Sequence, residues 1–187
     1  MGLSLKDDKL IVPAYDANGN LTTVQMIGED GKKMFLKGAQ VRGSSFTLTS
    51  SKGHDDSTPV YLAEGLATGV SVWLALNKLA EVHVCSSAGN ILSVAASLQR
   101  KYPARDFIIC ADNDRFTSGN SGLTHALEAA TSDGGKVTLP NFPDGGSGTA
   151  FYDLHLASGL GEVRRQLGTL VVAPYPPEPG LYRLALE

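Results

Sequence analysis

Three acidic residues lie where apolar runs end, and their types and spacing suggest metal chemistry. Glu64 follows the run "PVYLA", and Asp112 and Asp114 lie at the end of "RDFIICADND". In extended backbone, residues two positions apart point to the same side, so Asp112 and Asp114 can face one point. Crowded carboxylates repel one another unless a cation neutralises them. Their hard oxygen atoms suit Mg²⁺ or Mn²⁺, which usually also bind water and substrate phosphate. The pattern therefore predicts a site for phosphoryl-transfer chemistry.

The elements that must position these acids alternate along the chain between strands and helices. Short apolar runs predict strands at 59–64, 81–87, 105–112 and 136–140. Segments with helical spacing of apolar residues follow them at 66–80, 90–102, 121–135 and 149–168. This alternation predicts an α/β fold with a parallel sheet covered by helices on both faces. Ligands of such sheets bind beyond the carboxyl ends of the strands, which is where the three acids lie.

The N-terminal part of the chain has a different rhythm. Short strand-like runs joined by turns fill residues 9–49, and the Asn-Gly within "ANGN" is a strong hairpin signal. We therefore expect a small antiparallel β segment before the α/β part. The predicted divisions are a β-rich subdomain at 1–50, a polar linker at 51–58, an α/β domain at 59–170 and a proline-rich tail at 171–187.

Composition narrows the class of protein. The 187 residues are 42% hydrophobic and 19% charged, which is enough for a core and argues against wholesale disorder. A net charge of −3 gives no overall attraction to nucleic acid, so such binding must rest on local patches. Cys85 and Cys110 follow strand-like runs and are expected to be buried free thiols, which fits a reducing compartment. No secretory pattern and no membrane-length apolar run is found, so we expect a cytoplasmic protein with no membrane partner.

Several of these stretches together resemble a known domain. The ordered set "YLAEGLATGVSV", "SSAGN" and "FIICADND" looks like the Toprim domain, whose pattern is Glu-Gly after the first strand and Asp-x-Asp after the third. "NSGLTHALEAA" and "FYDLHLASGL" are similar to the Toprim regions of plasmid- and phage-type DNA primases. Residues 10–48 resemble the small segment that precedes Toprim in those primases. The zinc-binding module and helicase portion that often accompany such cores are missing, so we expect a fragment or a truncated relative.

The resemblance implies an activity and a set of site residues. The activity is metal-dependent synthesis of short RNA primers from nucleoside triphosphates on single-stranded DNA, in plasmid or phage replication or conjugation, with a replicative helicase as a partner. Glu64, Asp112 and Asp114 would be catalytic and would hold Mg²⁺ or Mn²⁺, with Glu64 either a ligand or a general base. Asp153 occupies the position of a further family acid and is a second-metal candidate. Tyr152 replaces the Asn that precedes this acid in the family.

Phosphate groups of template and nucleotide need cationic or polar partners. Lys37 and Arg42 lie in "FLKGAQVRG", within the locally basic stretch that resembles the primase segment. Arg115 is adjacent to the acidic pair, and Asn90 is expected at the same sheet edge as the acids. We expect these four residues to contact nucleic acid or nucleotide. Contacts of this kind are independent of base sequence and sensitive to salt.

Simpler interpretations remain for each of these features. Glu64 and Asp153 can serve only as acids near helix N-termini, and Asp112 and Asp114 can form an ordinary turn. Asn90 can be a helix cap, and the lysines of "GKK" can belong to a solvated turn. Two other functions also fit the sequence. One is a Toprim-type metal-dependent nuclease, and the other is a non-catalytic nucleic-acid-binding module of a larger replication protein.

Overall fold

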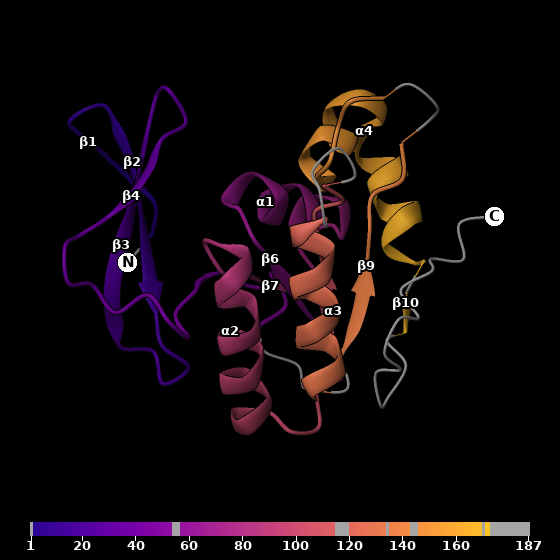
Figure 1. Cartoon of the computed structure of the whole chain (residues 1–187), viewed down its shortest axis with the longest axis horizontal. Coiled ribbons are helices and arrows are strands. Elements are labelled where there is room, and N and C mark those ends of the chain that lie inside the picture. The colour runs from indigo at the N-terminus through magenta and orange to yellow at the C-terminus, as the bar shows by residue number, and fades with distance from the viewer. Residues whose placement is uncertain are drawn as a thin grey trace.

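A computed structural model describes residues 2–53, 57–114, 120–133, 135–142, 146–169 and 171–172. Within them the chain forms two sheets with the strand orders β1-β2-β3-β4 and β10-β9-β8-β6-β7-β5. Figure 1 shows the first sheet standing beside the second, which carries the helices. The predicted fold class, an α/β unit with a parallel-containing sheet preceded by a small antiparallel sheet, is confirmed.

The N-terminal sheet is antiparallel throughout. Its strands are β1 (Ser4–Lys6), β2 (Lys9–Tyr15), β3 (Leu21–Gly28) and β4 (Lys33–Phe35). β1 was not expected from the sequence, because only three residues form it and its side chains are exposed. Asp7 and Asp8 both have positive φ, 48° and 54°, which is the backbone of the tight turns that join twisted antiparallel strands.

The main sheet is parallel at its centre and antiparallel at its edges. Its strands are β5 (Phe46–Leu48), β6 (Val60–Ala63), β7 (Glu81–Val84), β8 (Phe107–Cys110), β9 (Lys136–Thr138) and β10 (Val171–Val172). The four strands from β6 to β9 run parallel, as predicted. β5 departs from expectation, because it pairs with β7 instead of with the N-terminal strands. Phe46 of β5 is buried in a cluster with Val12 and Val84, so this pairing covers apolar surface of both sheets.

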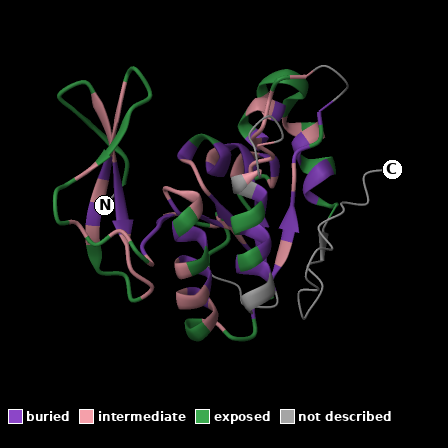
Figure 2. Cartoon of the chain, in the orientation of Figure 1, coloured by how far each residue is buried: buried purple, intermediate pink, exposed green. Residues whose placement is uncertain are grey.

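Within the described residues, four helices cover the two faces of the main sheet. They are α1 (Leu66–Ala75), α2 (Ala88–Lys101), α3 (Ser121–Asp133) and α4 (Phe151–Leu167). α2 packs against α3 on one face, and α1 packs against α4 on the other (Figure 1). Alternate strand residues serve the two faces: Leu62 joins the α2–α3 cluster, whereas Ala63 joins the α1–α4 cluster. The central strands are mostly buried, and every residue of β8 is buried (Figure 2).

Two further expectations concern the interior and the membrane. Cys85 and Cys110 are both buried and free, which confirms that prediction. No helix in the described ranges combines the length and the apolar character that crossing a membrane requires. Residues 173–187 of the expected tail and residues 54–56 of the expected linker lie outside the described part of the chain.

Candidate metal and nucleotide site

Strand pairing brings the predicted acids together at one edge of the main sheet. β6 and β8 are neighbouring parallel strands, and Ala63 is paired with Cys110 at their carboxyl ends. Glu64 is therefore the first residue beyond β6, and Asp112 follows β8 by two residues, at the same edge. Both segments leave the sheet there before α1 and α3 begin. The topology thus produces the arrangement that the sequence spacing predicted.

The pKa shifts of the acids show that their charges interact. Burial first, and then the charges of Glu64, Asp114 and Asp153 in that order, together raise the pKa of Asp112 from 3.8 to about 7. Burial also raises the pKa of Glu64, and Asp114 adds to the effect. One oxygen of Asp112, Oδ1, is buried and has no hydrogen-bond partner among the residues that the structure describes. A buried carboxylate oxygen without a partner is costly, so this atom requires a proton or a cation.

The acids do not form a finished metal centre by themselves. No group of three His, Cys, Asp or Glu side chains that could hold a metal ion is found among the described residues. The donor set nevertheless fits a hard divalent cation, because it consists of carboxylates around the partnerless Oδ1 of Asp112. Like charges also repel until a cation is present. Glu64, Asp112 and Asp114 could hold Mg²⁺ or Mn²⁺, and their role as metal ligands stays a prediction.

Glu64 is flanked by groups that favour its charged form. A backbone hydrogen bond from Ala88, the first residue of α2, lowers the pKa of Glu64, and so does the charge of His125 on α3. The N-terminus of a helix attracts negative charge, so α2 stabilises this carboxylate. The simpler interpretation, an acid near the start of α1, is incomplete, because Glu64 also interacts with Asp114 and α2.

Lys33 is a site residue that was not singled out from the sequence. Its Nζ atom lies 3.6 Å from the position that a Cβ atom on Gly65 would occupy. Its charge lowers the pKa of both Glu64 and Asp112. The neighbouring Lys32 instead pairs with Asp30 at 3.0 Å and is 82% exposed. No local signal distinguishes the two lysines of "GKK"; only the packing of the N-terminal sheet against the main sheet does.

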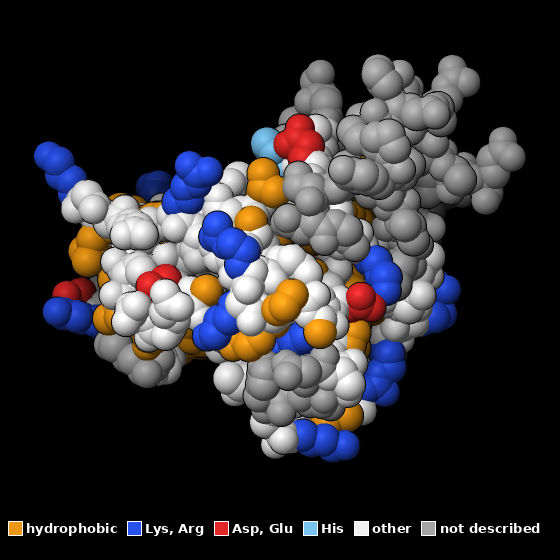
Figure 3. Space-filling view, turned by 90° about the horizontal axis from the view of Figure 1, so that it is seen from below, with side chains coloured by type: hydrophobic (Ala, Val, Ile, Leu, Met, Phe, Trp, Pro, Cys, Tyr) orange, Lys and Arg blue, Asp and Glu red, His pale blue; other side chains and the backbone are white. Residues whose placement is uncertain are grey.

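The predicted nucleic-acid contacts fall in different surroundings. Lys37 and Arg42 are exposed, and Arg42 Nε donates a hydrogen bond to Ser93 Oγ at 3.2 Å. Arg115 lies outside the described residues. Asn90 is only 5% exposed. The lysine and arginine side chains on the face shown in Figure 3 are dispersed, so on that face they form no single basic patch.

Asn90 fastens the N-terminal segment to the α/β part. Its Nδ2 donates to the carbonyl oxygens of Ser44 at 2.9 Å and Cys85 at 2.8 Å, and its Oδ1 accepts from the Gly43 N–H at 2.8 Å. The helix begins at Ala88, so Asn90 lies inside its first turn and does not cap it. These bonds give Asn90 a structural role, and a contact with nucleotide remains a prediction.

Asp153 begins α4. Its Oδ2 accepts hydrogen bonds from the backbone N–H groups of Thr149 at 2.9 Å and Ala150 at 3.0 Å. Such bonds satisfy backbone donors that a helix start leaves without partners. Asp153 still raises the pKa of Asp112, so it lies near the candidate site while serving as a helix cap.

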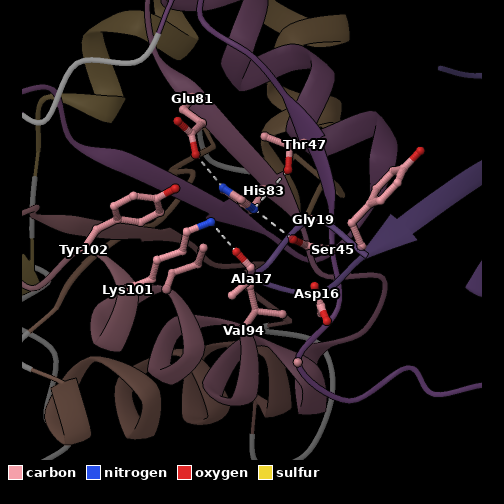
Figure 4. A pocket seen from close by; sticks show the side chains of 13 residues that line it. Asp16, Ala17, Gly19, Ser45, Thr47, Glu81, His83, Val94, Lys101 and Tyr102 are labelled. Carbon is pink, nitrogen blue, oxygen red and sulfur yellow. Dashed lines mark hydrogen bonds and ion pairs between the residues drawn. The ribbon is translucent and has the colours of Figure 1, made fainter. Parts of the chain in front are cut away.

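Away from the acidic site, a cavity lies between the N-terminal segment, β7 and α2 (Figure 4). It has a volume of about 230 Å³ and contains the buried side chain of His83. Ring atom Nδ1 is 2.8 Å from Ser45 Oγ, and Nε2 is 2.7 Å from Glu81 Oε1. The His83 hydrogen bond is also the largest cause that lowers the pKa of Glu81, to about 2. Because both ring nitrogens are engaged, we interpret this cluster as a junction that ties β5 to β7.

Comparisons with known proteins place this geometry in context. A DNA primase TraC from Escherichia coli is 38% identical over 141 residues, which cover 73% of this chain and 13% of that protein. The DnaG primase catalytic domain bound to single-stranded DNA matches with a TM-score of 0.60 at 17% identity, over 92% of this chain and 57% of that one. The primase fragment of the bacteriophage T7 primase-helicase protein matches with a TM-score of 0.59 at 14% identity, over 88% and 66%.

No family model matches the chain. The two structural matches establish a shared fold, and the sequence match establishes common descent with a short part of a much longer protein. The chain is homologous to a segment of DNA primase TraC and has the fold of primase catalytic domains.

Proposed function

We propose that this chain is the catalytic-core segment of a DNA primase, built around a Toprim-type acidic site. The observation that carries the proposal is the buried Asp112, whose Oδ1 has no partner and whose pKa is raised to about 7 by burial and by three neighbouring acids. Strongly shifted pKa values that arise from burial and neighbouring charges cluster at functional sites. Homology to TraC and the fold of primase catalytic domains support the same activity.

The proposed reaction is nucleotidyl transfer. The 3′-hydroxyl of one nucleotide attacks the α-phosphorus of a nucleoside triphosphate, a new phosphodiester bond forms, and pyrophosphate leaves. A Mg²⁺ or Mn²⁺ ion bound by Glu64, Asp112 and Asp114 would lower the pKa of the attacking hydroxyl and neutralise charge that develops on the phosphate. Glu64 can alternatively accept the hydroxyl proton itself, because its raised pKa favours proton uptake.

Lys33 and the exposed basic residues have complementary roles in this proposal. Lys33 lies beside Glu64 and Gly65, so its ammonium group is placed to bind the phosphates of an incoming nucleotide. Lys37 and Arg42 are exposed on the same N-terminal segment and would contact the backbone of single-stranded template DNA. We also propose a replicative helicase as a partner of this chain, because one structural relative is a fragment of a primase-helicase protein.

A priming assay tests the proposal. The wild-type chain is incubated with single-stranded DNA, nucleoside triphosphates and Mn²⁺, and labelled oligonucleotides are separated by size. Asp112→Asn should abolish template-dependent products, because it removes a carboxylate while keeping the shape of the side chain. Asp106→Asn is the matched control. Asp106 directly precedes the first residue of β8, at the end of the strand opposite to Asp112. Its side chain is 64% exposed and paired with Lys136.

The same assay separates the alternative functions. Shortened template without new oligonucleotides would support the Toprim nuclease. If Asp112→Asn primes as well as the wild type, the acidic site is not catalytic. Absence of both activities, with DNA binding retained in all three proteins, would support the non-catalytic binding module.

A further inference from the structure

Asn113, the residue between the two acids of "DND", joins three segments that surround the site. Its backbone N–H donates to the carbonyl oxygen of Thr149 at 2.7 Å. Its side-chain Oδ1 accepts from Asn120 Nδ2 at 3.0 Å, and its Nδ2 lies 3.5 Å from the carbonyl oxygen of Pro140. The first two bonds are short enough to be strong, whereas the third is at the weak limit.

The orientation of this amide pair follows from its partners. A carbonyl oxygen only accepts hydrogen bonds, so the side of Asn113 that faces Pro140 must be its NH₂ group. Its Oδ1 then faces Asn120, whose own NH₂ group donates to it. Oδ1 of Asn120 is consequently turned away from Asn113. Within the described ranges this atom is buried without a partner, as is Oδ1 of Asp112.

The three segments have fixed positions of their own. Pro140 follows β9, and Asn120 precedes α3, where its carbonyl oxygen accepts the Thr124 N–H. Thr149 precedes α4 and is held by Asp153. Gly148, in the same stretch, packs too closely against its neighbours to carry a side chain. A Cβ atom there would lie 2.4 Å from the Phe142 ring and 2.7 Å from Asp153 Cβ. Asn113 is therefore hydrogen-bonded to three segments that are each held in place by other contacts.

We propose that Asn113 is a positioning residue that sets the direction of the Asp112 and Asp114 carboxylates. This inference rests on the proposed function, in which those carboxylates hold a divalent cation. Residues that orient metal ligands through hydrogen bonds typically contribute about 10-fold to 100-fold in metal affinity or activity. Loss of the Asn113 side chain would let residues 112–114 adopt several arrangements, and the acids would then be ordered only upon binding.

Mn²⁺ binding measured by electron paramagnetic resonance tests this role without depending on activity. Asn113→Ala should weaken Mn²⁺ binding about 10-fold or more, while circular dichroism and the urea m-value remain those of the wild type. Asn18→Ala is the matched control, because Asn18 is exposed in the turn between β2 and β3. In the priming assay Asn113→Ala should lower kcat and leave KM for nucleotide unchanged, a pattern that mere loss of stability does not produce.

A second variant removes the same bond from its other side. Asn120→Gly deletes the partner amide, and glycine accepts the positive φ of 39° that Asn120 adopts. Its effect on Mn²⁺ affinity should have the same direction, and the double variant should be little worse than either single one, because both changes break one interaction. If Asn113→Ala folds poorly, the Asn120→Gly single variant still decides the question, because it breaks the same hydrogen bond.

The outcomes distinguish this inference from the proposed function. Wild-type Mn²⁺ affinity in Asn113→Ala and Asn120→Gly would overturn the positioning role while leaving the metal site intact. If the wild type does not bind Mn²⁺, or if Asp112→Asn binds it equally well, the metal site itself is refuted and the positioning role with it.

Discussion

Asp112 should make the metal-free protein less stable as pH rises. Burial and three neighbouring acids raise its pKa from 3.8 to about 7. The folded chain therefore holds this proton more tightly than the unfolded chain, so the free energy of unfolding falls between about pH 4 and about pH 7 and levels off above. Asp112→Asn removes the ionisable group and should abolish this part of the pH dependence.

The size of the effect follows from the pKa difference. At about 1.4 kcal/mol for each pH unit, the change from 3.8 to about 7 corresponds to about 4 kcal/mol at pH 8. Relaxation of the loop and entry of water reduce this value, so we expect Asp112→Asn to be about 2 to 4 kcal/mol more stable than the wild type at pH 8. At pH 4 the two proteins should be nearly equal, because Asp112 is then mostly protonated in the folded chain.

Urea unfolding with a chelator present, monitored by circular dichroism from pH 4 to pH 8, measures this effect. Asp106→Asn serves as the control and should change stability by less than about 1 kcal/mol, because its ion pair with Lys136 is exposed. Added Mn²⁺ should stabilise the wild type and not Asp112→Asn, since only the former has the complete ligand set. Parallel pH curves for the wild type and Asp112→Asn would refute the electrostatic reasoning.

Three further predictions concern single residues. Lys33→Met should raise KM for nucleoside triphosphates about fivefold in the priming assay, which corresponds to about 1 kcal/mol, whereas Lys32→Met should not change it. Asp153→Ala should lower the free energy of unfolding by about 1 kcal/mol through loss of the helix cap. If Asp153 serves only as that cap, Mn²⁺ affinity should stay within twofold of the wild type, and a larger loss would support a second-metal role. Gly69→Ala should cost about 1 to 3 kcal/mol in urea unfolding, because the new Cβ would lie 2.6 Å from Val84 Cγ2; an unchanged midpoint would contradict this packing.

The sequence predicted the central part of the fold because local patterns encode it. Four apolar runs became the parallel strands β6 to β9, and the helices followed each run as expected. Glu64 and Asp112 come from neighbouring strands of this sheet, so their closeness required only the correct strand order. Strand periodicity and the residues that follow each strand carried that information.

Other features depend on contacts between distant segments. In the sequence, β5 looks like a continuation of the N-terminal meander. Only the pairing of Phe46 with Val84 of the neighbouring strand β7 shows that β5 belongs to the main sheet. Lys33 and Lys32 are adjacent and chemically identical, yet one approaches Gly65 and the other pairs with Asp30. The buried bridge formed by Asn90 is equally invisible in a sequence, where its polar side chain suggests a surface contact.

The place of β5 also determines where this chain can be divided. β5 occupies the outer edge of the main sheet beside β7, and in this way it satisfies backbone groups that would otherwise form an open edge. A shortened chain that begins at residue 51 would lose β5, expose the edge of β7 and become prone to strand-to-strand aggregation. β5 is thus part of the fold of the α/β domain, and we expect that a cut at residue 50 does not yield two independently stable pieces.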